Sequence, residues 1–187
     1  MIDDVVARLR GEWYRLRYRL TSGGRVQIGK GFRAYASVDL GGPGHIRIGE
    51  NVTVRKDPFD HRSVSLHTMY SSGAEIVIED EVRLAGTHIS AGKLVKVERG
   101  AWVEDARIMD SDMHVVTSDA GSRHQDSVAD ARDVVIGQNA TVGSGAMLLK
   151  GASVGRGSLV RPGAVVMRPT PEDAVLAGFP ARPEEKG

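Results

Sequence analysis

The chain has 187 residues, 41% of them hydrophobic, which suits one domain with a real core. Its net charge of +1 gives no overall field that would favour nucleic acid as a partner. It contains no cysteine, which excludes disulfides, thiolate metal sites and a cysteine nucleophile. Because no apolar segment of signal-peptide type opens the chain, we expect a cytoplasmic protein.

The first expected element is a helix over residues 1–20. Spacings of three and four place seven large apolar residues on one face of it. They are Ile2, Val5, Val6, Leu9, Trp13, Leu16 and Leu20. Asp3 and Asp4 suit the positive end of the helix dipole, and five arginines make the remaining surface basic. Two interpretations stay open: a cap on the end of the fold or a neighbouring subunit, or a helix lying on an anionic membrane.

Residues 25–168 carry a repeat of six residues, which is clearest over residues 136–166. Its aliphatic members are Ile136, Val142, Leu148, Val154, Val160 and Val166. Three residues after each of the first five stands Asn or Gly, which tolerate a positive φ, and the next residue is always small. Six residues make a short strand and a corner, so three units close one triangular coil. The repeat predicts an all-β solenoid, a parallel β-helix, with a short N-terminal α-helix.

The repeat is weaker upstream, where Ile78 and Leu84, then Val103 and Met109, keep the six-residue step on the inward side. Two stretches interrupt it, residues 55–73 and 110–133, and we expect both to leave the solenoid as loops. Prolines follow residue 168, so we expect the coil to end there and residues 169–187 to form a C-terminal tail.

One histidine stands where the repeat breaks. With Met109 inward, strand alternation would place Asp110, Asp112 and His114 together on the outward face. Histidine is the natural base near neutral pH, and a carboxylate can orient it, with Asp112 preferred to Asp110. From position alone, His114 could equally be a surface histidine at a loop mouth. His124, in the same loop, is a second candidate for substrate contact.

Four stretches in chain order carry a family resemblance: SSGAEIVIEDEVRLAGTHI, IMDSDMH, VVIGQNATVGSGAMLLKGASVGRGSLVRPGAVVMR and AVLAGFPAR. They resemble the hexapeptide-repeat acyltransferases, and more closely the bacterial sugar and polysaccharide O-acetyltransferases. The resemblance implies a left-handed parallel β-helix and a homotrimer with inter-subunit active sites. The chain departs from the family at Thr141, where tryptophan is frequent, and at Pro162, where the family has Gly-Ala-Gly.

The resemblance also implies a reaction, the transfer of an acetyl group from acetyl-CoA to a hydroxyl of a sugar or glycan. His114 would be the general base, oriented by Asp112, with direct attack on the thioester and no metal. The implied cofactor-binding residues are Thr141, Ser144, Pro162, Gly163, Met167, Arg168 and Arg182. Two alternatives stay open: N-acetylation of an amino sugar or an antibiotic, and a non-catalytic β-helix acting as a scaffold or binding module.

Overall fold

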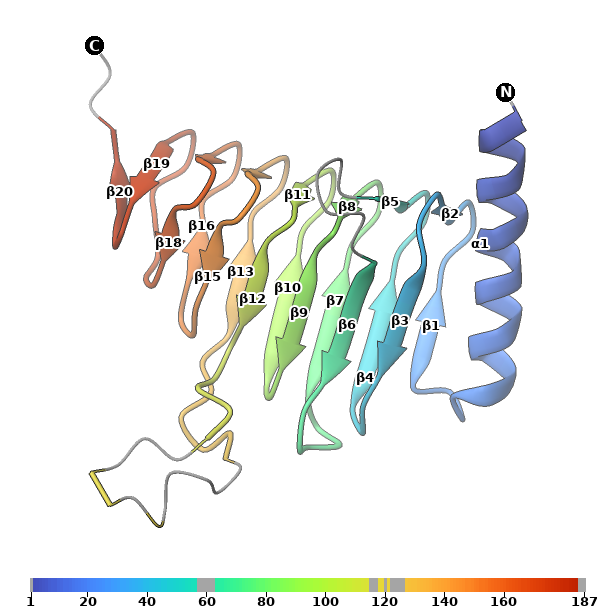
Figure 1. Cartoon of the computed structure of the whole chain (residues 1–187), viewed down its shortest axis with the longest axis horizontal. Coiled ribbons are helices and arrows are strands. Elements are labelled where there is room, and N and C mark those ends of the chain that lie inside the picture. The colour runs from blue at the N-terminus through green and yellow to red at the C-terminus, as the bar shows by residue number, and fades with distance from the viewer. Residues whose placement is uncertain (1, 57–62, 115–117, 120, 122–126, 185–187) are drawn as a thin grey trace.

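The computed structural model describes residues 2–56, 63–114, 118–119, 121 and 127–184. Within that part, one helix, α1 (Ile2–Thr21), lies at one end of a stack of β-coils, and the C-terminal strands lie at the other (Figure 1). The expected N-terminal helix is therefore confirmed. No described helix is long and apolar enough to cross a lipid bilayer.

The strands form three sheets. Sheet A contains β1 (Val26–Ile28), β4 (His45–Ile48), β7 (Glu75–Ile78), β10 (Leu94–Val97), β13 (Val134–Ile136) and β16 (Ser153–Val154). Sheet B contains β2 (Arg33–Ala34), β5 (Thr53–Arg55), β8 (Arg83–Ala85), β11 (Trp102–Glu104), β14 (Thr141–Val142), β17 (Leu159–Val160), β19 (Val175–Gly178) and β20 (Ala181–Pro183). Sheet C contains β3 (Val38–Gly41), β6 (Val64–Thr68), β9 (His88–Ala91), β12 (Arg107–Met109), β15 (Met147–Leu148) and β18 (Val165–Val166).

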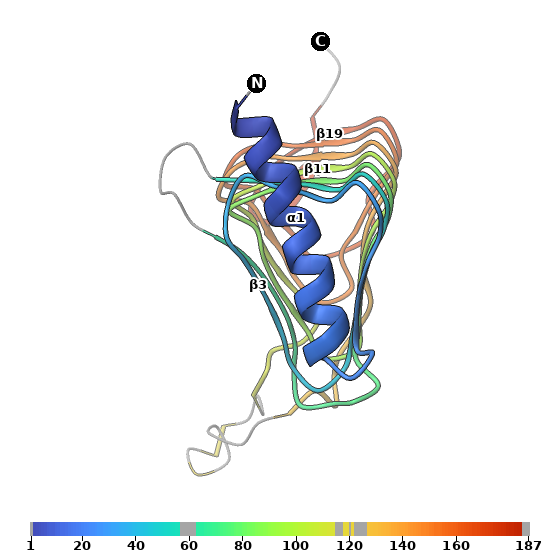
Figure 2. The ribbon, with the colours of Figure 1, turned by 90° about the vertical axis from the view of Figure 1, so that its right-hand side faces the viewer.

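From β1 to β18, successive strands belong to sheets A, B and C in turn. From β4 onward, each of them pairs in parallel with the strand three places before it in the chain. The result is a three-sided coil, seen along its axis as nested outlines with α1 lying across the near end (Figure 2). Each coil satisfies its backbone N–H and C=O groups through the coils before and after it.

The six-residue repeat of residues 136–166 is confirmed at all three of its positions. All six aliphatic members are buried in the core. The turn residues have positive φ, from 57° at Asn139 to 80° at Gly151. The small residues that follow are buried at the corners; they are Ala140, Ala146, Ala152, Ser158 and Ala164. A larger side chain there would have no room inside the corner.

Three sequence predictions are wrong in detail. Residues 64–68, expected within a loop, form strand β6, so the first interruption is confined to the chain between β5 and β6. Ile108, not Met109, is the inward residue of β12, because the step from Val103 is five residues and not six. The coil also continues past residue 168: β19 pairs with β17 and buries Leu176, and β20 closes the sheet in the antiparallel direction.

Helix α1 does cap the first coil, but with the face opposite to the apolar one. Its buried residues are Ala7, Gly11, Tyr14 and Tyr18, while the seven large apolar residues stay exposed. The tyrosine hydroxyls accept hydrogen bonds from the backbone N–H groups of Val38 and Leu40, both at 3.1 Å. An exposed strand edge needs such acceptors, which the two tyrosine hydroxyls supply and aliphatic side chains could not.

Candidate active site

The chain leaves the coil stack after β12 and rejoins it at β13 (Figure 1). Asp110 is the first residue after β12. Its carboxylate is fully buried and accepts three backbone N–H bonds, from Gly92 at 2.7 Å, Lys93 at 2.7 Å and Leu94 at 2.8 Å. The prediction that Asp110 faces outward beside His114 is therefore wrong. With Ile108 inward, alternation turns Asp110 inward as well, where it caps the turn of the preceding coil.

A lysine of the next coil holds both ends of the 110–133 segment. The ammonium group of Lys150 contacts the carboxylates of Asp112, at the start of the segment, and Asp130, near its end. Hydrogen bonds to Asp112 and then to Asp130 raise the pKa of Lys150, and the bond from Lys150 lowers the pKa of Asp130. We call these three residues the Lys150 clamp. Lys150 is thus engaged with two carboxylates.

His114 stands just beyond this clamp. Its side chain is exposed, and the residue before it, Met113, has a φ of 63°. A non-glycine residue in the left-handed region is uncommon and is often found at functional sites. The Met113 N–H bonds the Ser111 hydroxyl at 3.3 Å, and its C=O accepts from the Ser127 N–H at 3.1 Å, so the backbone beside His114 is held from both sides. His124 lies outside the described residues.

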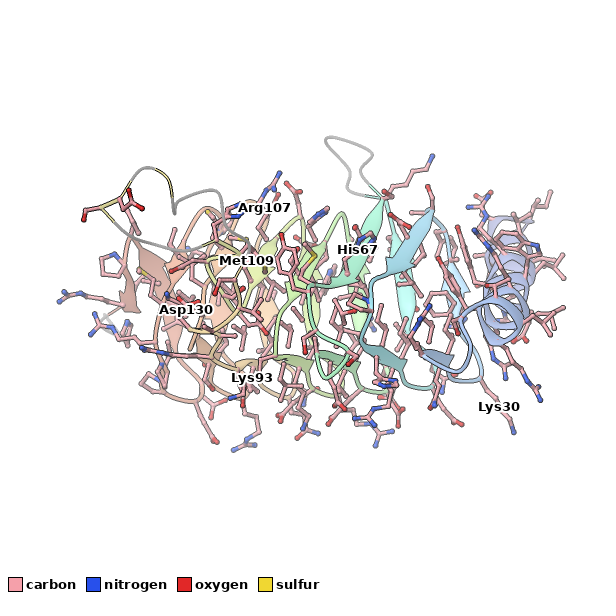
Figure 3. The ribbon with its side chains drawn as sticks, turned by 90° about the horizontal axis from the view of Figure 1, so that it is seen from below. Lys30, His67, Lys93, Arg107, Met109 and Asp130 are labelled. Atoms are coloured by element: carbon pink, nitrogen blue, oxygen red, sulfur yellow. The ribbon has the colours of Figure 1, made fainter. Side chains whose placement is uncertain are left out.

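Sheet C carries a row of polar side chains toward solvent, on the face next to the His114 segment. Strand pairing aligns Asp39, Ser65, His88 and Arg107 in one column, and His67, Ser90 and Met109 in the next. His67 and Met109 lie along the same side of the coil stack in Figure 3. His67 Nε2 lies 3.0 Å from Asp39 Oδ2, and Asp39, His88 and Arg107 line an open hollow of about 440 Å³. This face has the chemistry to contact hydroxyl groups.

Four of the predicted cofactor residues lie along sheet B and at the corner between sheets B and C. Thr141 stands between Trp102 and Leu159 on the outward face of sheet B. At the corner, the Gly163 N–H bonds the Ser144 C=O at 3.0 Å, which stacks residues 161–164 on residues 143–146. The hydroxyl of Ser144 donates to Asp105 Oδ2 at 3.4 Å. Pro162 packs closely on Gly143: a Cβ added to Gly143 would lie only 2.9 Å from the Pro162 ring.

Of the other three predicted cofactor residues, two follow the last strand of sheet C, and Arg182 lies in β20 of sheet B. Met167 and Arg168 directly follow β18, where the chain turns from sheet C to sheet A. Arg168 and Arg182 line one open groove of about 430 Å³ together with Thr170, Ala181 and three prolines. Two guanidinium groups beside one groove make a good site for phosphate oxygens. The structure therefore brings together two arginines that are 14 residues apart in the sequence (182 − 168 = 14).

The predicted site residues thus occupy two different corners of one chain. Ser144, Pro162 and Gly163 lie where the chain enters sheet C, whereas His114, Met167 and Arg168 lie where it leaves that sheet. Sheet C lies between these two corners. Among the described residues, no group of three or more His, Asp or Glu could hold a metal ion.

Residues 133–168 match the family model of the bacterial transferase hexapeptide, over six repeats. These six repeats therefore fit the hexapeptide pattern of that model. The match confirms the resemblance seen in the sequence for this part of the chain, and three parallel sheets with one N-terminal helix fit a left-handed β-helix. No curated protein sequence matches the chain.

Solved structures with similar coils extend the comparison over nearly the whole chain. A point mutant of AntD, an N-acyltransferase from Bacillus cereus in complex with dTDP-4-amino-4,6-dideoxyglucose and coenzyme A, superposes with a TM-score of 0.67 at 15% identity, covering 90% of this chain and 87% of AntD. AntD with dTDP and 3-hydroxybutyryl-CoA gives 0.65 at 16% identity, covering 90% and 87%. The acetyltransferase domain of PglB from Neisseria gonorrhoeae gives 0.53 at 16%, covering 91% and 66%. At these identities the likeness concerns the fold.

Two features of the site were missed in the sequence. In the Lys150 clamp, Lys150 is 20 positions from Asp130 and 38 from Asp112, and no local sequence pattern predicts pairs so far apart. The pair of His67 and Asp39 was also missed, although both residues stand on strands of one sheet. A correct strand register would have revealed the second pair, since it places both residues on the outward face of neighbouring strands.

Proposed function

We propose that this protein is an acyl-CoA-dependent acyltransferase that acetylates a hydroxyl of a sugar or glycan. The observation that carries the proposal is the placement of His114, exposed on a segment that Asp110 and the Lys150 clamp hold against hexapeptide coils. Support comes from the superposed N-acyltransferase and acetyltransferase structures, of which AntD holds coenzyme A and a sugar nucleotide. We also propose that the coils are left-handed. We further propose that the protein is cytoplasmic, because acyl-CoA is made and used in the cytoplasm.

The residues present suit an acyl-CoA donor. Arg168 and Arg182 line one groove and would hold phosphate groups, while Met167, 47% exposed, offers apolar surface beside them. The bound donor would supply an activated thioester. His114 would accept the proton of the acceptor hydroxyl as its oxygen attacks the thioester carbonyl, and would pass that proton to the departing CoA thiolate, so no covalent enzyme intermediate is needed. Asp112 remains the proposed orienting carboxylate, and its contact with Lys150 would set its place.

We further propose a homotrimer, because the two sets of predicted residues lie on different corners of one chain. A neighbouring copy that turns its Ser144 corner toward the His114 corner of the first would complete each site, with Thr141 and Pro162 along the donor. Sedimentation or light scattering at micromolar concentration should give three times the mass of the 20.1 kDa chain. A monomer that still transfers acyl groups would remove this part of the proposal.

The direct test of function is a thiol-release assay with acetyl-CoA over nucleotide sugars, free glycans and lipid-linked saccharides. We expect at least one saccharide to accelerate thiol release in proportion to enzyme. Hydroxylamine then identifies the product, because it cleaves an O-acetyl ester and leaves an amide intact. An amide product would favour the second candidate, N-acylation of an amino sugar, which the amino-sugar nucleotide bound to AntD suggests. No calorimetric binding of acetyl-CoA would favour a non-catalytic scaffold.

A further inference from the structure

The face of α1 that points away from the coils is apolar along its whole length. Its seven large residues have exposed fractions from 46% at Val6 to 81% at Ile2, with Leu9 at 67% and Leu20 at 73%. At about 100° per residue these positions fall within one arc of about 100°. They lie opposite Gly11 and the other docking residues, so burial against the coils does not explain their apolar character.

Arginines border this apolar face on both sides. Helical geometry places Arg8, Arg15 and Arg19 along one border and Arg10 along the other, while Arg17 lies nearer the docking side. Two of these arginines are paired within the helix, Arg8 with Asp4 at 2.9 Å and Arg15 with Glu12 at 2.6 Å. The helix has five arginines against Asp3, Asp4 and Glu12, a balance of 5 − 3 = +2. The guanidinium of Arg17 lies 5.2 Å from the centre of the Trp13 ring, at the boundary between the apolar and basic parts. Arginine stems can lie on apolar surface while their charged ends reach a polar interface.

A hollow beside one border offers a place for a charged headgroup. It measures about 380 Å³ and lies between the helix and β1, where Arg15, Leu16 and Arg19 form part of its wall together with Glu12, which is paired with Arg15. Apolar side chains and arginines therefore meet at the depth where the acyl chains and headgroups of a lipid monolayer meet.

We propose that α1 lies in the surface of an anionic membrane and that its exposed face is the docking surface. Charge decides between lipid and a second copy of the helix. With Arg8 and Arg15 already paired to Asp4 and Glu12, the helix still carries a net charge of +2, so pairing two such faces would bring like net charges together, whereas anionic headgroups complement that charge. Tryptophan and leucine facing outward from a basic helix are typical of interfacial binding.

This docking also orients the coils. Since α1 crosses the end of the stack, a helix lying flat would leave the coil axis standing away from the bilayer (Figures 1 and 2). His114 follows β12, in the fourth coil, so it would stand about 15 Å farther from the membrane than the first coil, at about 4.8 Å per coil. The polar face of sheet C would then run up from the membrane surface toward His114.

The test is flotation of the full chain with phosphatidylcholine vesicles, with and without 30% phosphatidylglycerol. We expect binding to the anionic vesicles that weakens with salt, and at least tenfold weaker partitioning for Leu9→Ser/Leu16→Ser. Both residues are exposed, so the variant should keep the circular dichroism spectrum of the parent. Phe179→Ser, at a side chain 77% exposed near the other end of the stack, is the matched control and should bind like the parent.

Tryptophan emission gives a second reading. The chain has two tryptophans, so Trp102→Phe leaves Trp13 as the single reporter, and its emission should shift to the blue with anionic vesicles only. Absence of flotation would overturn the proposal, as would equal binding by Leu9→Ser/Leu16→Ser. A change of oligomeric mass in that variant, without vesicle binding by the parent, would assign the face to a protein contact. None of these results depends on acyl transfer, so this proposal and the proposed function can fail separately.

Discussion

Asp110 reaches back one coil and accepts the N–H of Gly92 at 2.7 Å, so the carboxylate that starts the His114 segment belongs to the core and not to the solvent. The same group accepts two further N–H bonds, from Lys93 and Leu94. A buried acceptor that serves three donors is costly to remove, since each donor is left without a partner.

We therefore expect Asp110→Ala to lower the free energy of unfolding by about 2–4 kcal/mol. Asp110→Asn should also destabilise, because its amide nitrogen would face a donor. Denaturant unfolding followed by circular dichroism measures both. Asp133→Ala removes only an exposed ion pair with Lys93 and should change stability by about 1 kcal/mol or less. Equal losses in Asp110→Ala and Asp133→Ala would show that the buried bonds do not hold the segment.

The Lys150 clamp should hold the segment in place without taking part in proton transfer. Lys150→Met is expected to speed limited proteolysis within residues 110–133 and to lower kcat several-fold, because His114 loses a fixed support. Lys30→Met, at an exposed lysine of the first coil, should change neither. A Lys150→Met variant with normal kcat and normal protease resistance would rule out the clamp.

The sign of the pKa shifts sets the pH range of the clamp. Lys150 lowers the pKa of Asp130, so the contribution of Asp130 to stability is present above its usual pKa of 3.8 and is lost as pH falls through the lowered value. The pKa of Lys150 is raised by Asp112 and Asp130, so its contribution is present below 10.5 and is lost as pH rises through the raised value. Protease resistance should thus stay constant between about pH 5 and pH 9. A loss of protease resistance near pH 6 would contradict the role of the Lys150 clamp.

Gly11 should be a poor site for alanine, although alanine is the better helix former by about 1 kcal/mol. A Cβ at Gly11 would lie 1.9 Å from the backbone oxygen of Phe32, so the helix would have to move off the first coil. We expect Gly11→Ala to lose about 1–2 kcal/mol net in thermal or denaturant unfolding. Val6→Ala, on the exposed face, gains helix propensity without a clash and should be neutral or stabilising. A stabilised Gly11→Ala would mean that α1 does not dock here.

The arginines of the C-terminal groove should contribute to donor affinity. Arg168→Gln and Arg182→Gln are each expected to weaken acetyl-CoA binding by about tenfold or more, since each removes charge-assisted bonds to phosphate. Isothermal titration calorimetry measures this without knowledge of the acceptor. Arg156→Gln, at a different corner and paired with Glu172, is the control. Unchanged affinity in both groove variants would place the donor elsewhere.

Some of the structure could be predicted from the sequence because it repeats. Across residues 136–166 a buried aliphatic residue recurs six times at the same spacing, so the periodicity identifies the coil, its corners and its buried residues. At β12 one corner is a residue shorter, and the inward residue was therefore predicted wrongly. Because Ile108 follows Val103 after five residues, Met109 and Asp110 each lie on the face opposite to the predicted one. Asp110 therefore does not share the outward face with Asp112 and His114.

Other features could not be predicted because they depend on what lies nearby in space. The apolar face of α1 looks like the side that should dock, yet the edge of the first coil presents N–H groups that Tyr14 and Tyr18 satisfy. The pairing of Lys150 with Asp112 and Asp130 likewise depends on the stacking of neighbouring coils. Arg182 meets the groove only because the chain continues through β19 and β20.

The most direct measurement is the rate of acceptor-dependent thiol release from acetyl-CoA by His114→Ala, with the acceptor that the parent enzyme uses best. We predict that kcat falls by about 10²–10⁴-fold while acetyl-CoA affinity and unfolding free energy stay unchanged. His45→Ala, at an exposed histidine of sheet A, should retain full activity. A His114→Ala enzyme that keeps near-normal turnover would contradict the account, because no proton acceptor would then be required at His114.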